Sequence, residues 1–359
     1  MPGHPQVRDR RPRRGGLSVL AVTGRTRPRA RLTGVASYVP ERVLTNAELE
    51  KMVDTTDEWI RERTGISERH IAADDQATSD LALAAAQALL RSTRTSAADI
   101  DLLIIATTTP DHIFPPTATL VADQLGATSA AALDINAVCS GFVYGLAHAT
   151  GMVESGLARK VMVIGAETLS RIVDWNDRST CVLFADGAGA ALIEADDEGE
   201  PGSGIIGFEL GADGSGKDIL CIPAGGSRRP ARSEGVEPAD LCIQMAGREV
   251  FRFATRIMVE SATRLLQEAG LTTDDVDLLV AHQANMRILQ HAAEKLEIPP
   301  DKVVINIDRF GNTSSASIPI ALAEAVERGN VSPGDLLLMV GFGAGLTWGA
   351  ALVRWEPRA

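Results

Sequence analysis

Asp99-Ile-Asp-Leu-Leu-Ile104 and Asp275-Val-Asp-Leu-Leu-Val280 are two copies of one sequence pattern, 176 residues apart, and each leads into an apolar run typical of a buried strand. An amphipathic segment rich in alanine and leucine precedes each copy, at about 79–91 and 256–269, and predicts a helix. Strands that alternate with helices in two similar halves predict an α/β fold built by duplication.

The rest of the chain fits a division into two halves. The same offset aligns residues 133–140 with 309–316, and both segments precede helical patterns. A stretch rich in glycine, proline and serine lies between the two copies and would join them. We therefore expect an N-terminal half at 31–200 and a C-terminal half at 201–359, after an Arg-rich, disordered extension at 1–30. Further strands are expected at 31–37, 160–165, 181–193, 204–210, 303–307, 335–340 and 346–354.

The charge of the chain is unevenly distributed, and this limits its partners. The 359 residues carry 35 basic and 47 acidic side chains, a net charge of −12, but residues 1–31 hold nine arginines and one aspartate, which leaves −20 on the rest. A body this acidic repels phosphate backbones, so we expect no nucleic-acid partner. Two uncharged stretches, 135–153 and 336–353, approach the length of a membrane span, but glycines and polar residues interrupt both. We expect them in a buried core rather than in a membrane.

Recognisable metal and cofactor motifs do not occur in the sequence. The four cysteines have neither C-x-x-C spacing nor a nearby histidine pair, which excludes the common zinc and redox motifs. The stretch 211–218 resembles a phosphate-binding loop, but Asp218 stands where Ser or Thr must bind magnesium. We therefore expect no metal and no cofactor. Four cysteines without such motifs and the lack of a secretory apolar core predict a cytoplasmic location.

Cys139 is the strongest candidate for a nucleophile. It follows the strand-like run 131–138 and opens the helix-like run 141–153, so its sulfur would lie at a helix N-terminus. There the free N–H groups and the helix dipole favour the thiolate. The alternative, an inert buried thiol, is the interpretation we keep for the other three cysteines, Cys181, Cys221 and Cys242.

A thiolate nucleophile needs groups that handle protons and developing negative charge, and two residues fit. His282 stands where the buried strand of the second copy ends in polar residues. Asn312 stands in the segment that the repeat aligns with the cysteine segment. The duplication would bring these loops together at the centre of the molecule, although either residue alone could be structural.

Six blocks of sequence stand in order between about Arg31 and Trp355. They are Asp57-Glu-Trp-Ile-Arg-Glu-Arg-Thr-Gly-Ile66, Ala137-Val-Cys-Ser-Gly-Phe142, Asp186-Gly-Ala-Gly-Ala190, His282-Gln-Ala-Asn-Met-Arg287, Gly311-Asn-Thr-Ser-Ser-Ala-Ser-Ile-Pro319 and Gly341-Phe-Gly-Ala-Gly-Leu-Thr-Trp-Gly349. Together they resemble the signature blocks of the β-ketoacyl-acyl carrier protein synthase III family. The resemblance implies the thiolase fold, with two βαβαβαββ halves in a five-layer α-β-α-β-α arrangement, and a homodimer.

The resemblance also implies a decarboxylative Claisen condensation in two half-reactions. Cys139 would take an acyl group from an acyl-coenzyme A, and malonyl-acyl carrier protein would enter next. His282 and Asn312 would then stabilise the enolate as carbon dioxide leaves. The N–H of Cys139 and one from the glycine turn 343–345 would form an oxyanion hole. Coenzyme A thioesters would be substrates, so no cofactor is implied.

Further positions match the family's binding residues. By the resemblance, Trp59 and Arg178 would enclose the adenine of coenzyme A, Arg63 would contact a phosphate, and Asn285 the pantetheine. Phe114 would reach across the dimer to close the partner's acyl pocket, and Phe342 would pack beside the active site. Three basic residues would receive the acidic carrier protein: Arg252, Arg287 and Lys295.

Three alternatives remain beside chain initiation in fatty acid synthesis. The chain could supply starter units in secondary metabolism, such as polyketide synthesis, or it could be an acyltransferase that never condenses. It could also be a non-catalytic partner. The intact set of Cys139, His282 and Asn312 argues against the last two, because acyl transfer alone does not need the decarboxylating asparagine. The acyl chain preferred is left open by the sequence.

Overall fold

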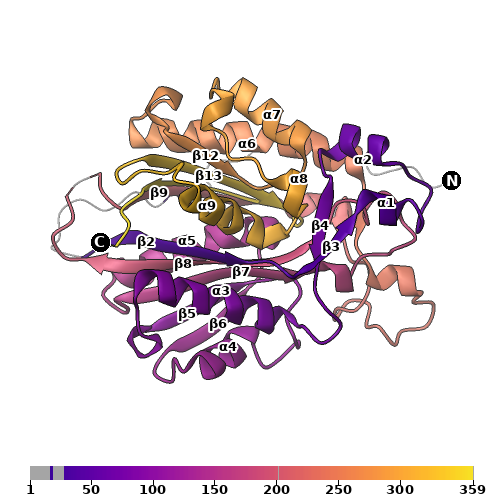
Figure 1. The fold of residues 1–359 in the computed structure, drawn as a ribbon, viewed down its shortest axis with the longest axis horizontal. Coiled ribbons are helices and arrows are strands. Elements are labelled where there is room, and N and C mark those ends of the chain that lie inside the picture. The colour runs from indigo at the N-terminus through magenta and orange to yellow at the C-terminus, as the bar shows by residue number, and fades with distance from the viewer. Residues whose placement is uncertain (1–16, 19–27, 201, 359) are drawn as a thin grey trace.

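The computed structural model describes residues 17–18, 28–200 and 202–358, and its core consists of two five-stranded sheets with helices between and outside them. Figure 1 shows five layers: outer helices, a sheet, a central layer of helices, the second sheet and further outer helices. The predicted α/β duplication and the thiolase-like layering are therefore confirmed.

The N-terminal half forms the sheet with the strand order β2-β8-β7-β5-β6. Strand β5 is buried along its whole length and pairs in parallel with both neighbours, as expected for a strand covered on both faces. A two-stranded ribbon, β3 with β4, and two short helices lie beside this sheet. The elements are β2 (Arg29–Tyr38), β3 (Arg42–Thr45), α1 (Asn46–Leu49), α2 (Asp57–Thr64), β4 (Glu68–Ile71), α3 (Thr78–Thr93), β5 (Leu102–Ala106), α4 (Thr117–Leu125), β6 (Ala131–Ile135), α5 (Gly141–Glu154), β7 (Lys160–Thr168) and β8 (Asp186–Asp196).

The C-terminal half contributes the strands β9-β14-β13-β12 of the second sheet, β1-β9-β14-β13-β12, and these repeat the order β2-β8-β7-β5 of the first sheet. Its elements are β9 (Ile205–Ala212), β10 (Leu220–Cys221), β11 (Gln244–Met245), α6 (Gly247–Ala269), β12 (Leu278–Ala281), α7 (Met286–Lys295), α8 (Ile307–Phe310), α9 (Ser317–Glu327), β13 (Leu336–Gly343) and β14 (Thr347–Arg354). Strand β1 (Leu17–Ser18) adds to the edge of β9. The chain passes from one half to the other between β8 and β9.

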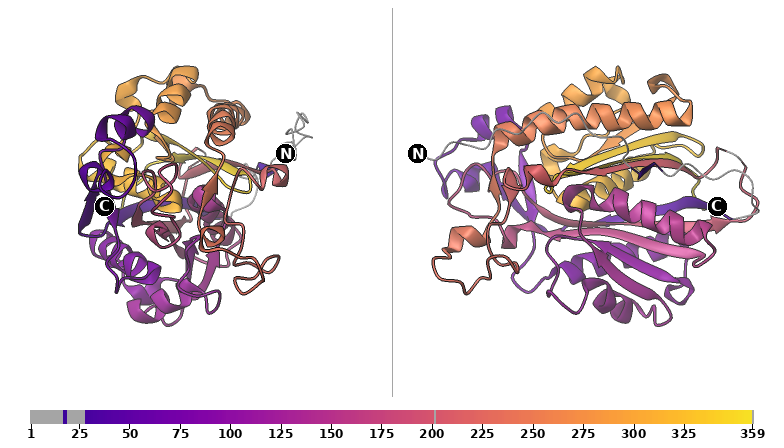
Figure 2. Two further views of the ribbon diagram at one scale, coloured as in Figure 1. Left: turned by 90° about the vertical axis from the view of Figure 1, so that its right-hand side faces the viewer. Right: turned by 180° about the vertical axis from the view of Figure 1, so that it is seen from behind.

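Helices α5 and α9 form the central layer and pack against both sheets. The outer helices α3 and α4 cover the first sheet, and α6 and α7 cover the second, as the two further views also show (Figure 2). Helix α6 ends at Gly270, which has the left-handed φ of 70° typical of a helix C-cap. The sequence repeat is reproduced residue by residue, since β5 and β12, β7 and β13, and α5 and α9 each begin 176 residues apart.

Four expectations need correction. Residues 303–307 form no strand beyond a single bridge between Val303 and Leu279, and β8 begins at Asp186 rather than at 181. Helix α6 begins nine residues before the expected start at 256. In the segment expected to be disordered, Leu17–Ser18 pair with β9 and β2 already begins at Arg29. The remainder of that expectation, for residues 1–16 and 19–27, lies outside the described residues.

Candidate active site

Cys139 lies in a 3₁₀ turn, Val138–Ser140, between strand β6 and helix α5. Val138 has a left-handed φ of 50°, an uncommon and strained conformation for a β-branched residue. The end of β13 packs directly on this turn, because a Cβ on Gly343 would stand 2.7 Å from the backbone nitrogen of Cys139. The structure therefore places the thiol at the start of α5, as the sequence predicts, and against the glycine turn.

The thiol is buried, and burial governs its protonation. Only 6% of Cys139 is exposed, and this loss of solvent raises the pKa of the thiol to about 12. The neighbouring Ser314 side chain opposes the rise, whereas the carboxyl of Glu167 adds to it. Desolvation thus opposes the lower pKa that the sequence analysis expects from the helix N-terminus.

His282 directly follows strand β12 and is 1% exposed. Burial lowers the pKa of its imidazole to about 3, so the ring is neutral near pH 7. Its Nδ1 lies 2.6 Å from the Ser317 hydroxyl, which already accepts from the N–H of Gln283 at 3.4 Å. In the tautomer in which Nδ1 accepts the Ser317 proton, the ring proton stands on Nε2 and can be donated in a hydrogen bond.

Asn312 is held by both its backbone and its side chain. Its backbone bridges to residues 183–185, with Asn312 N donating to Leu183 O and Ala185 N donating to Asn312 O, both at 2.9 Å. Its Oδ1 accepts from Ser314 N at 2.9 Å. Because the oxygen end of the amide is engaged, the NH₂ end is the group that can donate to a substrate oxygen.

The turn of the nucleophile has an equivalent in the C-terminal half, which begins two residues after Asn312. The turn of Cys139, Val138–Ser140, packs against the corresponding turn Ser314–Ala316, and both precede the central helices α5 and α9. Ser314 has a φ of 49°, almost the value at its repeat partner Val138. The phenyl ring of Phe342 stands edge-on to the His282 ring at 5.4 Å between centroids, beside the site.

Glu167 is a buried carboxyl group near the site that the sequence analysis missed. It is 0% exposed, and desolvation raises its pKa. Its Oε2 accepts from Thr108 N, Thr108 Oγ1 and Thr109 Oγ1 at 2.8–3.0 Å, and its Oε1 lies 2.9 Å from Ser315 Oγ. A lone acid at the end of the apolar run 161–166 was the available signal. The Glu167 carboxyl therefore links the ends of β5 and β7 to the loop of residues 311–316, which carries Asn312 (the asparagine loop).

The residues expected to bind coenzyme A lie together at the surface. The guanidinium carbon of Arg178 stands 5.1 Å from the centroid of the Trp59 ring, so the two side chains stack on each other. Arg63 is exposed, and its carbonyl accepts from Asn285 Nδ2 at 2.8 Å. Asn285 Oδ1 also caps helix α7 by accepting from Arg287 N, so the Asn285 amide already makes structural hydrogen bonds at both ends.

The expected carrier-protein residues lie on the adjacent helices α6 and α7. Arg252, Arg287 and Lys295 are all exposed, and Arg287 stacks on Phe251 with 5.4 Å between the guanidinium carbon and the ring centroid. Phe114 is 82% exposed and its neighbour Ile113 is 92% exposed, so Phe114 closes no pocket within its own chain.

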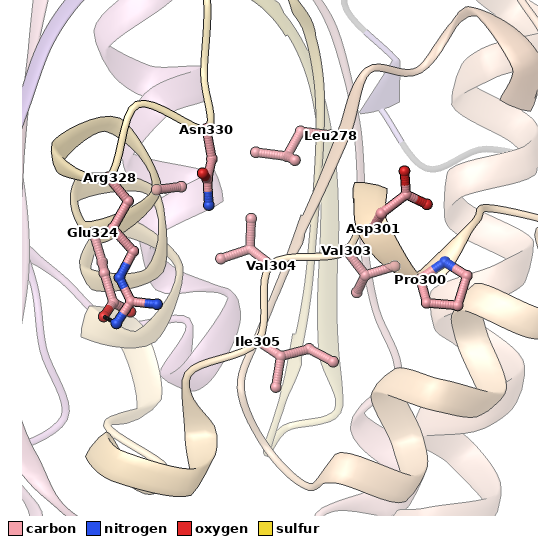
Figure 3. Close-up of a pocket in the computed structure, with 10 residues that line it drawn as sticks. Leu278, Pro300, Asp301, Val303, Val304, Ile305, Glu324, Arg328 and Asn330 are labelled. Carbon is pink, nitrogen blue, oxygen red and sulfur yellow. Dashed lines mark ion pairs between the residues drawn. The ribbon is translucent and has the colours of Figure 1, made fainter.

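One surface cavity of about 500 Å³ lies apart from these residues, between helix α9 and the segment that follows α7 (Figure 3). Glu324 in its wall pairs with Arg328 at 2.7 Å. None of the expected site residues lines it; the lining residues are Leu278, Pro300, Asp301, Val303, Val304, Ile305, Glu324, Ala325, Arg328 and Asn330.

Two absences hold for the described part of the chain. No cluster of three or more His, Cys, Asp or Glu side chains there could hold a metal ion. Within residues 28–200 and 202–358, no helix has the length and apolar character needed to cross a membrane.

Comparisons with known proteins agree with this geometry. Residues 133–214 match the family described as 3-oxoacyl-[acyl-carrier-protein (ACP)] synthase III, and residues 266–355 match its C-terminal region. A β-ketoacyl-[acyl-carrier-protein] synthase III of Desulfitobacterium hafniense is 52% identical over 327 residues, which are 91% of this chain and 98% of that protein.

Solved structures of the same family superpose on this chain over most of its length. The 3-oxoacyl-[acyl-carrier-protein] synthase III of Aquifex aeolicus VF5 superposes with a TM-score of 0.83 at 47% identity and covers 91% of this chain and 100% of that one. The priming β-ketosynthase of the R1128 polyketide biosynthetic pathway superposes with a TM-score of 0.86 at 37% identity, over 92% and 98% of the two chains.

Proposed function

The chain belongs to the β-ketoacyl-acyl carrier protein synthase III family, and from this premise we propose that it joins the acyl group of an acyl-coenzyme A to malonyl-acyl carrier protein. It is a condensing acyltransferase. The observation that carries the proposal is the packing of the buried Cys139 turn against the turn that follows Asn312, next to Ser317, whose hydroxyl lies 2.6 Å from His282 Nδ1.

The first half-reaction forms a thioester on Cys139. The sulfur attacks the acyl-coenzyme A carbonyl, the bond to coenzyme A breaks, and the thiol proton leaves with the departing coenzyme A. Because burial raises the pKa of the free thiol, this proton must be removed while the acyl donor is bound. Backbone N–H groups of Cys139 and the glycine turn stabilise the tetrahedral intermediate.

The second half-reaction forms the carbon–carbon bond. Malonyl-acyl carrier protein loses carbon dioxide, and the electron pair moves into an enolate whose oxygen accepts from His282 Nε2 and Asn312 Nδ2. The carbanion attacks the acyl carbon and releases Cys139, which regains a proton. A neutral imidazole and an amide suit this role, since both donate hydrogen bonds without adding a negative charge.

The partners follow from the same premise. Four residues bind coenzyme A: Trp59, Arg63, Arg178 and Asn285. The adenine enters between the indole of Trp59 and the guanidinium of Arg178, which stack on each other in this structure. Arg252, Arg287 and Lys295 offer a basic surface on an acidic body, which suits an acidic carrier protein. The enzyme works in the cytoplasm as a homodimer, and strand β6, at the edge of its sheet with Leu133 partly exposed, supports that assembly.

The deciding experiment is intact-protein mass spectrometry after incubation with straight and branched acyl-coenzyme A esters, followed by malonyl-acyl carrier protein. We expect an adduct on the native enzyme, none on Cys139→Ser, and discharge of the adduct as a β-ketoacyl product. An adduct that survives the chase would indicate an acyltransferase without condensing activity. Labelling of Cys139→Ser would exclude the assigned nucleophile.

A polyketide starter enzyme is the second candidate, because the R1128 priming ketosynthase shares this fold at 37% identity. Chain initiation in fatty acid synthesis is the first choice. The relatives named β-ketoacyl-[acyl-carrier-protein] synthase III, whose names mention no polyketide pathway, are more similar to this chain, at about 50% identity. Offering the acylated enzyme malonyl groups on carrier proteins of either pathway separates the two. Faster discharge by the polyketide carrier would favour the second candidate.

A further inference from the structure

Thr347, the first residue of β14, lies where the nucleophile loop meets the glycine turn. Its Oγ1 is 2.9 Å from the carbonyl oxygen of Ala137, two residues before Cys139. The same atom is 3.1 Å from the carbonyl oxygen of Ala344, in the turn between β13 and β14. It also accepts from Ser140 Oγ at 2.9 Å, directly after Cys139. One hydroxyl therefore joins both sides of Cys139 to the glycine turn.

The hydrogen bonds of this cluster depend on one another. Ser140 Oγ can donate either to Thr347 Oγ1 or to Ala137 O, which lies at 2.8 Å. The hydroxyl protons of Ser140 and Thr347 are therefore shared among three acceptors, namely two backbone carbonyls and the Thr347 oxygen. In every arrangement the proton of Thr347 goes to Ala137 O or Ala344 O. Removing that proton leaves one of the two carbonyls without its side-chain donor. The Ala344 carbonyl is the one that loses its donor, because Ser140 can still donate to Ala137 O in the absence of the Thr347 hydroxyl.

The segments joined by Thr347 carry the N–H groups assigned to the oxyanion hole. The turn is already close to Cys139, since a Cβ on Gly343 would stand 2.7 Å from Cys139 N and 3.3 Å from Thr347 Oγ1. Rotation of the 344–345 peptide would change the direction of the turn's N–H groups relative to the N–H of Cys139. An oxyanion hole works only when its donors are held at about 2.7–3.1 Å from the developing oxyanion.

We propose that Thr347 is a positioning residue, which orients the glycine turn against the Cys139 loop so that their N–H groups converge on one oxyanion. Thr347 touches no reacting atom and acts through Ala137, Ser140 and Ala344. The proposal rests on the proposed function, because it concerns the tetrahedral intermediate formed when Cys139 is acylated.

The test compares Thr347→Val, which keeps the branched shape and loses the hydroxyl, with Thr347→Ser, which keeps the hydroxyl. Single-turnover acylation of Cys139 by an acyl-coenzyme A is followed by mass spectrometry. We expect the valine variant to acylate about ten- to a hundredfold more slowly, with full final labelling and an unchanged half-saturating substrate concentration. The serine variant should recover most of the native rate.

The measured amplitude separates this role from a structural one. A variant that merely folds poorly would label a smaller fraction of the protein at the native rate. Thr150→Val is the matched control, because Thr150 in α5 also donates its hydroxyl to a carbonyl, that of Leu146 at 2.8 Å, but away from the glycine turn. It should acylate at the native rate.

Two results would overturn the proposal: native-rate acylation by Thr347→Val, or a Thr347→Ser variant as slow as the valine variant. Failure of the proposed function would look different, since the native enzyme itself would then acquire no adduct from any acyl-coenzyme A.

Discussion

The acidity of Cys139 depends on how strongly the closed site desolvates it. Burial raises the pKa of the thiol to about 12, so the thiolate fraction should grow about tenfold per pH unit throughout the neutral and mildly alkaline range. We expect the rate of Cys139 alkylation by iodoacetamide to rise steadily from pH 7 to about 9.5, read by mass spectrometry of the Cys139 peptide. A plateau near pH 7 would show instead that the helix N-terminus lowers the pKa.

Substitution of Asn312 by aspartate, which replaces the amide NH₂ by an oxygen, allows the two half-reactions to be tested separately. In Asn312→Asp the carboxylate can still accept from Ser314 N, so the loop keeps its anchor, but the donor is replaced by a negative charge. That charge repels the enolate oxygen. We expect acylation of Cys139 within about twofold of native and release of carbon dioxide from malonyl-acyl carrier protein reduced at least a hundredfold. Equal losses in both assays would contradict the assigned role.

The sequence indicates the three proposed reacting side chains but not the groups around them. Cys139, His282 and Asn312 stand at strand ends or in loops within recognisable blocks. Glu167, Ser317 and Thr347 act through partners 35 to 210 residues away, such as Ser315 for Glu167, and no local pattern marks such partners. Burial of the thiol was likewise hidden, because it depends on both halves.

Close approach of β7 to the asparagine loop requires a glycine. A Cβ on Gly165 would stand 2.2 Å from the carbonyl oxygen of Ser315 and 3.0 Å from the nitrogen of Ala316, and a backbone cannot rotate away as a side chain can. We expect Gly165→Ala to lower the free energy of unfolding by about 3 kcal/mol or more. Urea denaturation followed by circular dichroism measures the loss.

Gly151→Ala is the control for that experiment. Gly151 lies within helix α5, and a Cβ there would meet nothing within 4 Å. Alanine has the higher helix propensity, so this variant should be about 0.5–1 kcal/mol more stable than the native protein. If both variants changed stability alike, the contact between β7 and Ser315 would not be the cause.

Helices and strands were predicted correctly where the two halves repeat the same sequence pattern. They were missed where side chains, rather than a neighbouring strand, bond to the backbone. Residues 303–307 have the β-branched pattern of a strand, but Gln283 Nε2 donates to Val304 O and Gln283 Oε1 accepts from Asn306 N. These bonds replace a strand partner and lead the chain into α8. Residues 181–185 are apolar too, yet they bridge to Asn312 instead of extending β8.

At the scale of the molecule, the β6 edge of the first sheet is the surface that we expect a second copy to cover. Strand β6 ends that sheet with Leu133 37% exposed, and Phe114 protrudes from the same half. We expect Leu133→Lys to shift the protein from dimer to monomer in sedimentation velocity, because a buried lysine without a partner is costly at an interface. Leu157→Lys, at a position 73% exposed beyond α5, should leave the dimer intact. A native protein that sediments as a monomer would exclude the assembly.

The failed strand at 303–307 also limits how copies of this chain can add to one another. If the second half had copied the first completely, the second sheet would end in a long strand equivalent to β6, and β6 of one copy could pair with that strand of the next without limit, as in a filament. Instead β12 is followed by a side-chain-bonded segment with one bridge, while β6 pairs through five residues on its inner side. Because β6 has no equivalent in the second half, it can pair with the β6 of a second copy across a two-fold axis, and the imperfect duplication would then favour a closed assembly over a filament.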